Sequence, residues 1–225
     1  MSKVRILLTG GGTGGHIYPL VAVAEELKKE NVEIFYLGPK SDLNKEFLRQ
    51  GIRVFTIAGG KWRRYFSLSN FADISNFMLS CVQSLLRLFI LMPDVVFSKG
   101  GTGSLPVVLA SRFYFIPIII HESDAVPGLA SRISARCASR IAIAFRGAAV
   151  YFPVKKTAQV GNPVRPSLAR DRLEPPAAKK LWGFDPMKAV VFVWGGSQGA
   201  GRLNEFMVKN LVSFLDYFQV IHQCG

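Results

Sequence analysis

The sequence predicts an α/β fold with a doubly wound parallel sheet, and three observations lead to this class. Patterns typical of strands and of helices alternate along the 225 residues, as they do in chains that build helix-covered parallel sheets. An apolar run at 4–9 ends in a glycine-rich turn, after which apolar residues recur at helical spacing. The same succession of strand, glycine-rich turn and helix returns at 190–217.

Each element is expected from its local pattern. Short apolar runs bounded by glycine, proline or polar residues predict strands, at 4–9, 32–37, 53–57, 95–98, 117–121, 141–144, 158–160, 190–194 and 220–222. Longer segments with apolar residues three and four apart predict helices, at 19–30, 43–50, 70–91, 104–113, 128–139 and 202–217.

The distribution of these elements predicts one complete domain and the opening of a second. Residues 1–160 hold enough strands and helices for a Rossmann-like domain, whereas 187–225 hold only a β-α-β unit, too small to bury a core of its own. The proline-containing segment 161–186 between them predicts a hinge. We expect the rest of the second domain to be missing by truncation or to come from another polypeptide.

Composition narrows the partners and the compartment. A formal net charge of +13 predicts an anionic partner, namely nucleic acid, anionic lipid or a phosphorylated substrate. Cys81, Cys137 and Cys224 are widely spaced and form no C-x-x-C, which favours buried thiols over a disulfide framework or a metal site. No long apolar core precedes the first glycines, so no signal peptide is expected.

The first glycine-rich turn reads GGGTGGH at 10–16, and free N–H groups at a helix start are suited to phosphate. A P-loop is excluded, because His16 and Ile17 stand where Lys and Ser or Thr are required. The spacing also fits G-x-G-x-x-G, but the second strand runs into Gly38-Pro39-Lys40 without an acidic residue for a ribose. A third interpretation is a glycosyltransferase loop in which His16 faces an acceptor hydroxyl; the alternative is that His16 only packs the turn.

Two further turns follow later strands. The segment 99–104, KGGTGS, precedes a helix and is either a second phosphate site or a plain tight turn. His121, Glu122, Ser123 and Asp124 follow an apolar strand, so they are expected at the carboxyl edge of the sheet. The alternative for His121 and Glu122 is a buried structural pair.

Five motifs, in order along the whole chain, resemble one family. They are GGGTGGH with IYPLVAVAEEL behind it, DVVFSKGGTGSLPVVLA, IIIHES, VGNPVR and WGGSQGAGRLN. Together they are similar to the undecaprenyl-pyrophosphoryl-MurNAc-pentapeptide N-acetylglucosaminyltransferases, which form lipid II of peptidoglycan. The resemblance implies a GT-B fold, an N-terminal acceptor- and membrane-binding domain, a C-terminal UDP-GlcNAc domain, and inverting transfer with a β-1,4 bond on the cytoplasmic face of the bacterial inner membrane.

The reaction implied by the resemblance assigns roles to residues. An acceptor hydroxyl needs a general base, and His16, a side chain suited to this at neutral pH, is the first candidate, with Glu122 and Asp124 beside it. The family usually carries Asn where this chain has Asp124, and unlike Asn an ionised Asp cannot donate to a sugar hydroxyl. It commonly carries an aromatic residue where this chain has Thr102.

A diphosphate leaving group needs N–H donors or cations. The donor contacts implied are Thr13, Gly14, Gly15, Arg165, Ser197, Gln198 and Asn204. The acceptor and pyrophosphate contacts implied are Gly12, Gly100, Gly101, Thr102 and Asp124. There is no D-x-D motif, which disfavours a metal-bridged diphosphate, and no cofactor is expected.

Two segments favour a membrane surface. Residues 77–92 are strongly apolar but too short and interrupted for a spanning helix, and 61–66 combine cationic with aromatic side chains, as interfacial segments do. The membrane contacts predicted are Trp62, Arg63, Arg64, Phe66, Leu86 and Phe89. The alternative is that this helix only covers the core. Arg132, Arg136 and Arg140 form a basic stripe, either a solvated face or a lipid-phosphate contact.

The sequence also allows other function classes. The main alternative is a non-catalytic acceptor-binding or membrane-recruiting subunit of a split glycosyltransferase. We expect the 225 residues alone to be inactive, because the family's remaining donor contacts lie further along the chain. The absent ribose acid disfavours an NAD-type dehydrogenase. Nucleic-acid binding is suggested by charge alone, since the basic residues form no known module.

Overall fold

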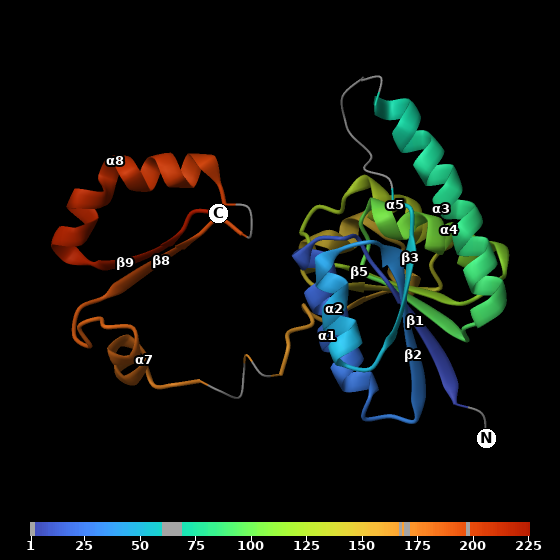
Figure 1. The fold of residues 1–225 in the computed structure, drawn as a ribbon, viewed down its shortest axis with the longest axis horizontal. Coiled ribbons are helices and arrows are strands. Elements are labelled where there is room, and N and C mark those ends of the chain that lie inside the picture. The colour runs from blue at the N-terminus through green and yellow to red at the C-terminus, as the bar shows by residue number, and fades with distance from the viewer. Residues whose placement is uncertain (1–2, 60–68, 167, 169–171, 197–198) are drawn as a thin grey trace. The chain divides into compact units, whose positions relative to one another are not determined.

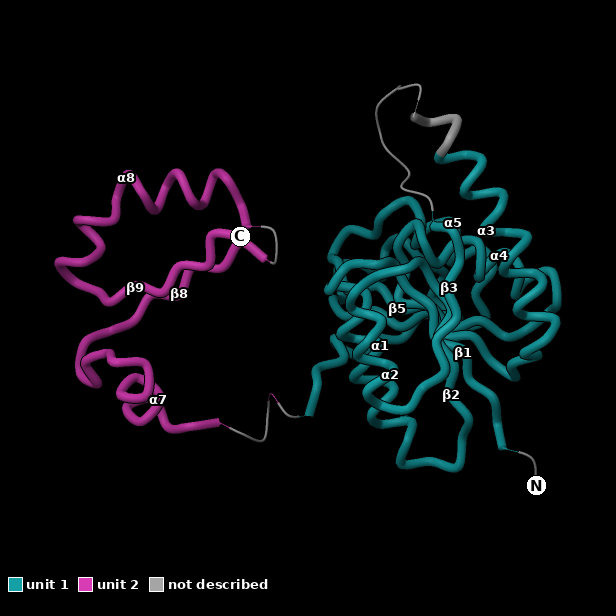
Figure 2. The backbone as a smooth tube through the Cα atoms, in the orientation of Figure 1, with its two compact units in different colours: residues 1–166 teal, residues 167–225 magenta. Residues whose placement is uncertain are grey.

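The computed structural model describes residues 3–59, 69–166, 168, 172–196 and 199–225. The chain forms two compact units, unit 1 at 1–166 and unit 2 at 167–225 (Figure 2).

Unit 1 is built on a parallel sheet of seven strands in the order β3-β2-β1-β4-β5-β6-β7 (Figure 1). The strands are β1 (Val4–Thr9), β2 (Val32–Pro39), β3 (Arg53–Ile57), β4 (Val95–Ser98), β5 (Ile118–Glu122), β6 (Arg140–Ile143) and β7 (Thr157–Gln159). All six neighbouring pairs are parallel. The order reverses between β1 and β4, which is the switch point where ligands bind in open α/β sheets. The predicted fold class is confirmed.

Helices cover both faces of this sheet, because successive strand residues point to opposite sides. On one face, Ile17 and Leu20 pack with Leu8 and Tyr36; on the other, Leu88 packs in a cluster that includes Leu7. The helices of the unit are α1 (Gly14–Leu27), α2 (Lys45–Arg49), α3 (Ser69–Leu91), α4 (Leu105–Phe113) and α5 (Leu129–Cys137). The 3₁₀ segments are η1 (Asp42–Asn44), η2 (Thr102–Ser104), η3 (Arg146–Tyr151) and η4 (Val154–Lys156).

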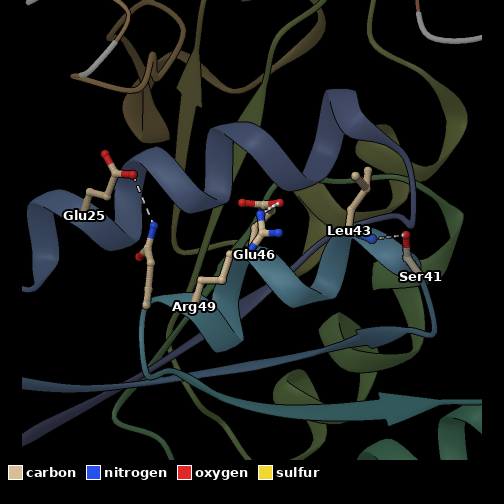
Figure 3. A network of polar contacts seen from close by, with 6 residues as sticks. Glu25, Ser41, Leu43, Glu46 and Arg49 are labelled. Carbon is tan, nitrogen blue, oxygen red and sulfur yellow. Dashed lines mark hydrogen bonds and ion pairs between the residues drawn. The ribbon is translucent and has the colours of Figure 1, made fainter.

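Polar contacts hold α2 beside α1 on the first of these faces (Figure 3). Gln50, just after α2, donates to Glu25 of α1 at 3.2 Å. Ser41 Oγ accepts from the Leu43 N–H at 3.3 Å and caps the 3₁₀ segment that leads into α2 (Figure 3). The first contact joins the end of α2 to α1, and the second fixes the start of the segment that leads into α2.

Helix α3 packs on unit 1 through one face only. Ser80, Ser84, Leu88 and Leu91, spaced three or four apart, are buried. Ser80 Oγ also accepts from the Gly59 N–H at 3.0 Å. The opposite face, called here the outer stripe of α3, is exposed and consists of Ile74, Met78, Leu79, Val82, Leu86, Phe89 and Ile90.

One helix of the described residues is long and apolar enough to cross a membrane, at Asp73–Leu91, by length and composition. A core helix of a water-soluble protein passes the same test, so this property by itself is weak support for a span. Here 22% of the apolar window is buried inside the protein.

Unit 2 contains α7 (Pro175–Leu181), β8 (Val190–Trp194), α8 (Gly201–Tyr217) and β9 (Gln219–Gln223). Its two strands pair in parallel, with Val190 opposite Gln219. This is a β-α-β unit preceded by a short helix. Phe192 and Trp194 stack with ring centroids 6.2 Å apart and are both exposed.

Two elements differ from the sequence expectations. Helix α1 begins at Gly14 instead of residue 19, because Thr13 has the extended conformation of an N-cap residue and Pro19 is tolerated inside the helix. Pro19 has no N–H to donate to the Gly15 carbonyl, but Gly15 is exposed, so water can bind that carbonyl instead. Helix α7 lies within the segment predicted as a hinge, and its first positions are prolines, which suit a helix start.

Candidate active site

Three turns meet at the carboxyl edge of the sheet of unit 1, after the adjacent strands β1, β4 and β5. The turns after β1 and β4 are joined by backbone hydrogen bonds. The Gly11 N–H donates to the Gly100 carbonyl at 2.9 Å, and the Lys99 N–H donates to the Thr9 carbonyl at 2.8 Å. The strand order therefore brings together segments that are almost 90 and more than 100 residues apart in the sequence.

His16 lies in the first turn of α1 and is fixed from both sides of its ring. Its Nδ1 is 2.8 Å from the Thr13 hydroxyl. A Cβ atom at Gly11 would lie 2.8 Å from Nδ1, and one at Gly101 would lie 2.9 Å from Nε2. Both distances are too short for a real contact, so the two glycines form a slot in which the imidazole occupies the space that their side chains would need.

The imidazole lines a pocket of about 350 Å³. Its polar wall contains His16, Lys99, Thr102, Glu122, Ser123 and Asp124. Its other wall comes from α4 and from the start of α5, with Leu105, Gly128, Leu129, Ala130, Ser131 and Ile133. The structure thus brings His16, Glu122, Asp124, Gly101 and Thr102 together, all of which the sequence singled out.

The charges in this pocket act on the His16 imidazole. Burial lowers the His16 pKa, the positive charge of Lys99 lowers it further, and Asp124 and Glu122 oppose that shift. Glu122 is buried, and its Oε1 accepts from the Asp124 N–H at 2.8 Å. Asp124 itself is exposed. The arrangement favours an uncharged imidazole beside carboxylates.

His121 turns away from this pocket, although its neighbour Glu122 lines it. The His121 Nε2 lies 2.8 Å from the Gly161 carbonyl, which ties β5 to the start of the segment that leaves unit 1. Its Nδ1 is buried without a partner among the described residues. Burial lowers the His121 pKa. The structure therefore favours a structural role for His121.

The other turn residues take up separate positions. Gly12 accepts from the Ser41 hydroxyl at 2.9 Å through its carbonyl, so it faces β2. Gly100, with φ of +82°, lies beside the pocket wall, since a Cβ there would be 3.2 Å from Ser131 Oγ. Gly14 and Gly15 belong to the first turn of α1.

The residues assigned to the donor lie in both units. In unit 1, the Arg165 guanidinium lies 4.6 Å from the ring centroid of Tyr18, on α1. In unit 2, Asn204 donates to the Cys224 carbonyl at 2.9 Å, and its Oδ1 lies 3.0 Å from His222 Nε2. Ser197 and Gln198 lie outside the described residues.

Of the predicted membrane contacts, Leu86 and Phe89 lie on the outer stripe of α3 and are 60% and 66% exposed. Trp62, Arg63, Arg64 and Phe66 lie outside the described residues. Across the part of the chain that the structure describes, no three His, Cys, Asp or Glu residues gather as metal ligands would.

Sequence reasoning missed two parts of this site. The sequence pattern assigns Lys99 only to the start of a glycine-rich turn, although a lysine directly after a buried strand indicates a cation at the carboxyl edge of the sheet. The wall from α5 carries no chemical motif, and only the packing of α5 next to the strand ends reveals it.

Comparisons with known proteins identify the family of the chain. The family model of the glycosyltransferase family 28 N-terminal domain matches residues 6–143. A Bacillus cereus protein named UDP-N-acetylglucosamine--N-acetylmuramyl-(pentapeptide) pyrophosphoryl-undecaprenol N-acetylglucosamine transferase 2 is 38% identical over 222 residues. That alignment covers 98% of this chain and 62% of the relative, so the chain spans less than two thirds of its length.

Solved structures share the fold. MurG from Acinetobacter baumannii has a TM-score of 0.67 at 22% identity, covering 99% of this chain and 59% of that one. UDP-GlcNAc 2-epimerase from Neisseria meningitidis, bound to UDP-GlcNAc, has a TM-score of 0.68 at 14% identity, covering 99% and 66%.

Proposed function

Because the chain belongs to glycosyltransferase family 28, we propose that it acts in the transfer of N-acetylglucosamine from UDP-GlcNAc to undecaprenyl-pyrophosphoryl-MurNAc-pentapeptide, lipid I, to give lipid II. The names of relatives 38% identical to it support this substrate pair. In this proposal unit 1 binds the lipid-linked acceptor, and unit 2 contributes to the UDP-GlcNAc site.

The observation that carries the proposal is the pocket around His16. An acceptor hydroxyl becomes a nucleophile when a base takes its proton. When Nδ1 of His16 carries the proton and donates to Thr13, Nε2 is the free acceptor, and it is the ring atom nearest to Gly101. Burial and Lys99 both favour the neutral ring that can act in this way.

The reaction proposed is a single inverting displacement. The acceptor hydroxyl oxygen forms a bond to C1 of N-acetylglucosamine, the bond between C1 and the diphosphate oxygen of UDP breaks, and the hydroxyl proton passes to His16. Inversion of the α-linked donor gives the β-1,4 bond. UDP leaves with the electron pair, and N–H groups or cations stabilise its growing charge.

The remaining residue roles belong to this proposal. The acceptor pyrophosphate would be held at the turns that contain Gly12, Gly100, Gly101 and Thr102. Asp124, at the exposed mouth of the pocket, would contact the acceptor sugar. Thr13, Gly14, Gly15, Arg165, Ser197, Gln198 and Asn204 would serve the donor.

A peripheral position on the cytoplasmic face of the inner membrane is part of the same proposal, because the acceptor is anchored in lipid. The outer stripe of α3 supports it as a continuous apolar surface. Arg112 adds a cation on α4, which packs against α3, and its guanidinium lies 5.6 Å from the ring centroid of the exposed Phe115. Apolar area with nearby cations is suited to anionic lipid.

A transfer assay with labelled UDP-GlcNAc and a lipid I analogue in detergent tests the proposal. Lipid II formation by this chain supports it. Binding of the analogue without transfer would instead favour the acceptor-binding subunit of a split enzyme. If the folded chain neither binds the analogue nor transfers the sugar, the proposal is refuted.

The role of His16 is tested in a chain that shows transfer. His16→Ala should lower turnover by about 10²–10⁴-fold, the usual contribution of a general base, while donor affinity changes little. Thr13→Val, which removes only the partner of Nδ1, should show a smaller loss. Near-normal turnover of His16→Ala would rule out the base assignment.

A further inference from the structure

Lys99 is a buried cation to which no contact with substrate and no proton transfer has been assigned. It follows β4 directly and is only 4% exposed. Its Nζ donates to Ser123 Oγ at 2.9 Å, so it joins the turn after β4 to the turn after β5. It also lines the pocket that contains His16.

The Lys99 charge is not neutralised by direct contact with a carboxylate. Among the described residues, the ion pairs within 4.0 Å involve Lys29, Arg49 and Arg53 as the cations. Burying an ammonium group is costly unless it gains something in return. Burial lowers the Lys99 pKa, and Glu122 and Asp124 oppose that shift, so the two carboxylates favour the charged ammonium that donates to the Ser123 hydroxyl.

We propose that Lys99 is a positioning residue of this pocket: through Ser123 it fixes the turn that carries Glu122 and Asp124, and its charge keeps the His16 ring in the uncharged, proton-accepting form. The inference rests on the proposed function, since the proton-accepting role of His16 belongs to it.

The groups that face His16 set the direction of this effect. From the turn after β4, Lys99 lowers the His16 pKa, and from the turn after β5, Asp124 and Glu122 raise it. Before α1, the Thr13 hydroxyl contacts Nδ1 and carries no charge. The wall from α5 is uncharged, with Gly128, Leu129, Ala130, Ser131 and Ile133. Lys99 is therefore the cation on the pocket wall, and removing it leaves two carboxylates to stabilise the imidazolium.

The test is an NMR titration of the histidine rings of the whole chain, which does not depend on transfer. In Lys99→Met the midpoint of His16 should move to higher pH, and that of His121 should follow, since Lys99 lowers its pKa too. Lys156→Met is the matched control, because its ammonium donates to the Ala138 carbonyl at 2.9 Å and is absent from the pocket.

Two further variants separate charge from contact. Lys99→Gln keeps a donor for Ser123 and removes the charge, so it should show the same upward shift and replaces Lys99→Met if that variant unfolds. Ser123→Ala keeps the charge, so the backbone amide signal of Asp124 should move while the His16 midpoint stays low.

An unchanged His16 midpoint in both Lys99→Met and Lys99→Gln would overturn the inference. The same conclusion follows if Lys156→Met shifts the midpoint as much as they do. In a transfer assay, the acid limb of the rate profile should move to higher pH in Lys99→Gln. If the wild-type chain neither transfers the sugar nor binds the lipid I analogue, the proposed function fails, while the titration still decides the role of Lys99.

Discussion

Substituting Gly101 by alanine should displace His16, and the structure gives the size of the effect. Gly101 has φ of +85° and ψ of 156°, a region open essentially to glycine alone. An alanine there costs about 1–3 kcal/mol of backbone strain. The new Cβ would lie 2.9 Å from His16 Nε2 and 3.1 Å from the Gly11 Cα.

Ordinary contact between such atoms begins at about 3.5 Å, so the imidazole or the turn must move away by roughly 0.6 Å. Misplacement of a catalytic group by about 1 Å can cost about 10²-fold in rate. We therefore expect Gly101→Ala to lose about 10- to 100-fold in transfer. The melting temperature should fall by about 2–4 °C for each kcal/mol of strain.

Gly51→Ala is the matched control. Gly51 also has positive φ, +70°, but no atom lies within 4 Å of its added Cβ. This variant should lose stability while the His16 NMR signals and the transfer rate stay unchanged. If Gly101→Ala leaves the His16 signals in place and melts as Gly51→Ala does, the glycine slot does not position the imidazole.

Three other predictions follow from the same contacts. The pKa values of His16 and His121 are lowered in the fold, so below about pH 6.5 the unfolded chain binds more protons than the folded chain, and stability should be lost as the pH falls through the lowered pKa values. His121→Asn should therefore make the melting temperature fall less steeply between about pH 7 and 5. The same slope in the variant and the wild type would contradict this. Asp124→Asn removes a charge that raises the His16 pKa, so the midpoint of the His16 titration should move to lower pH, while the new amide can donate to a sugar hydroxyl. A rise in the midpoint would contradict the effect assigned to the Asp124 charge. The double variant Leu86→Ser and Phe89→Ser should bind anionic vesicles less than the wild type in a sedimentation assay. The control Leu48→Ser, at an exposed position on α2, should bind as the wild type does. Equal binding by the double variant, the control and the wild type would exclude the outer stripe of α3 as the lipid contact.

The site could be predicted from the sequence where it depends on strand ends. Apolar runs predicted these strands, and the residues that follow a parallel strand were expected at the carboxyl edge of the sheet. The order that makes β1, β4 and β5 neighbours, and so brings His16, Gly101 and Glu122 together, comes from the structure.

Features that depend on packing could not be predicted in this way. His121 follows the same strand logic as Glu122, yet it binds the Gly161 carbonyl, which is 40 residues away. Lys99 donates to Ser123, which is 24 residues away, and no local pattern reports that contact. The early start of α1 depends on the extended conformation of Thr13, since Pro19 alone would favour a later start.

The slot around His16 also constrains how such a chain can vary. Gly11 and Gly101 come from distant segments, yet each is excluded from carrying a side chain by the same imidazole. A substitution at Gly11 should therefore be tolerated only after His16 has been replaced by a smaller residue, which makes the order of the two changes matter. Gly101 would stay constrained even then, because its positive φ disfavours any side chain.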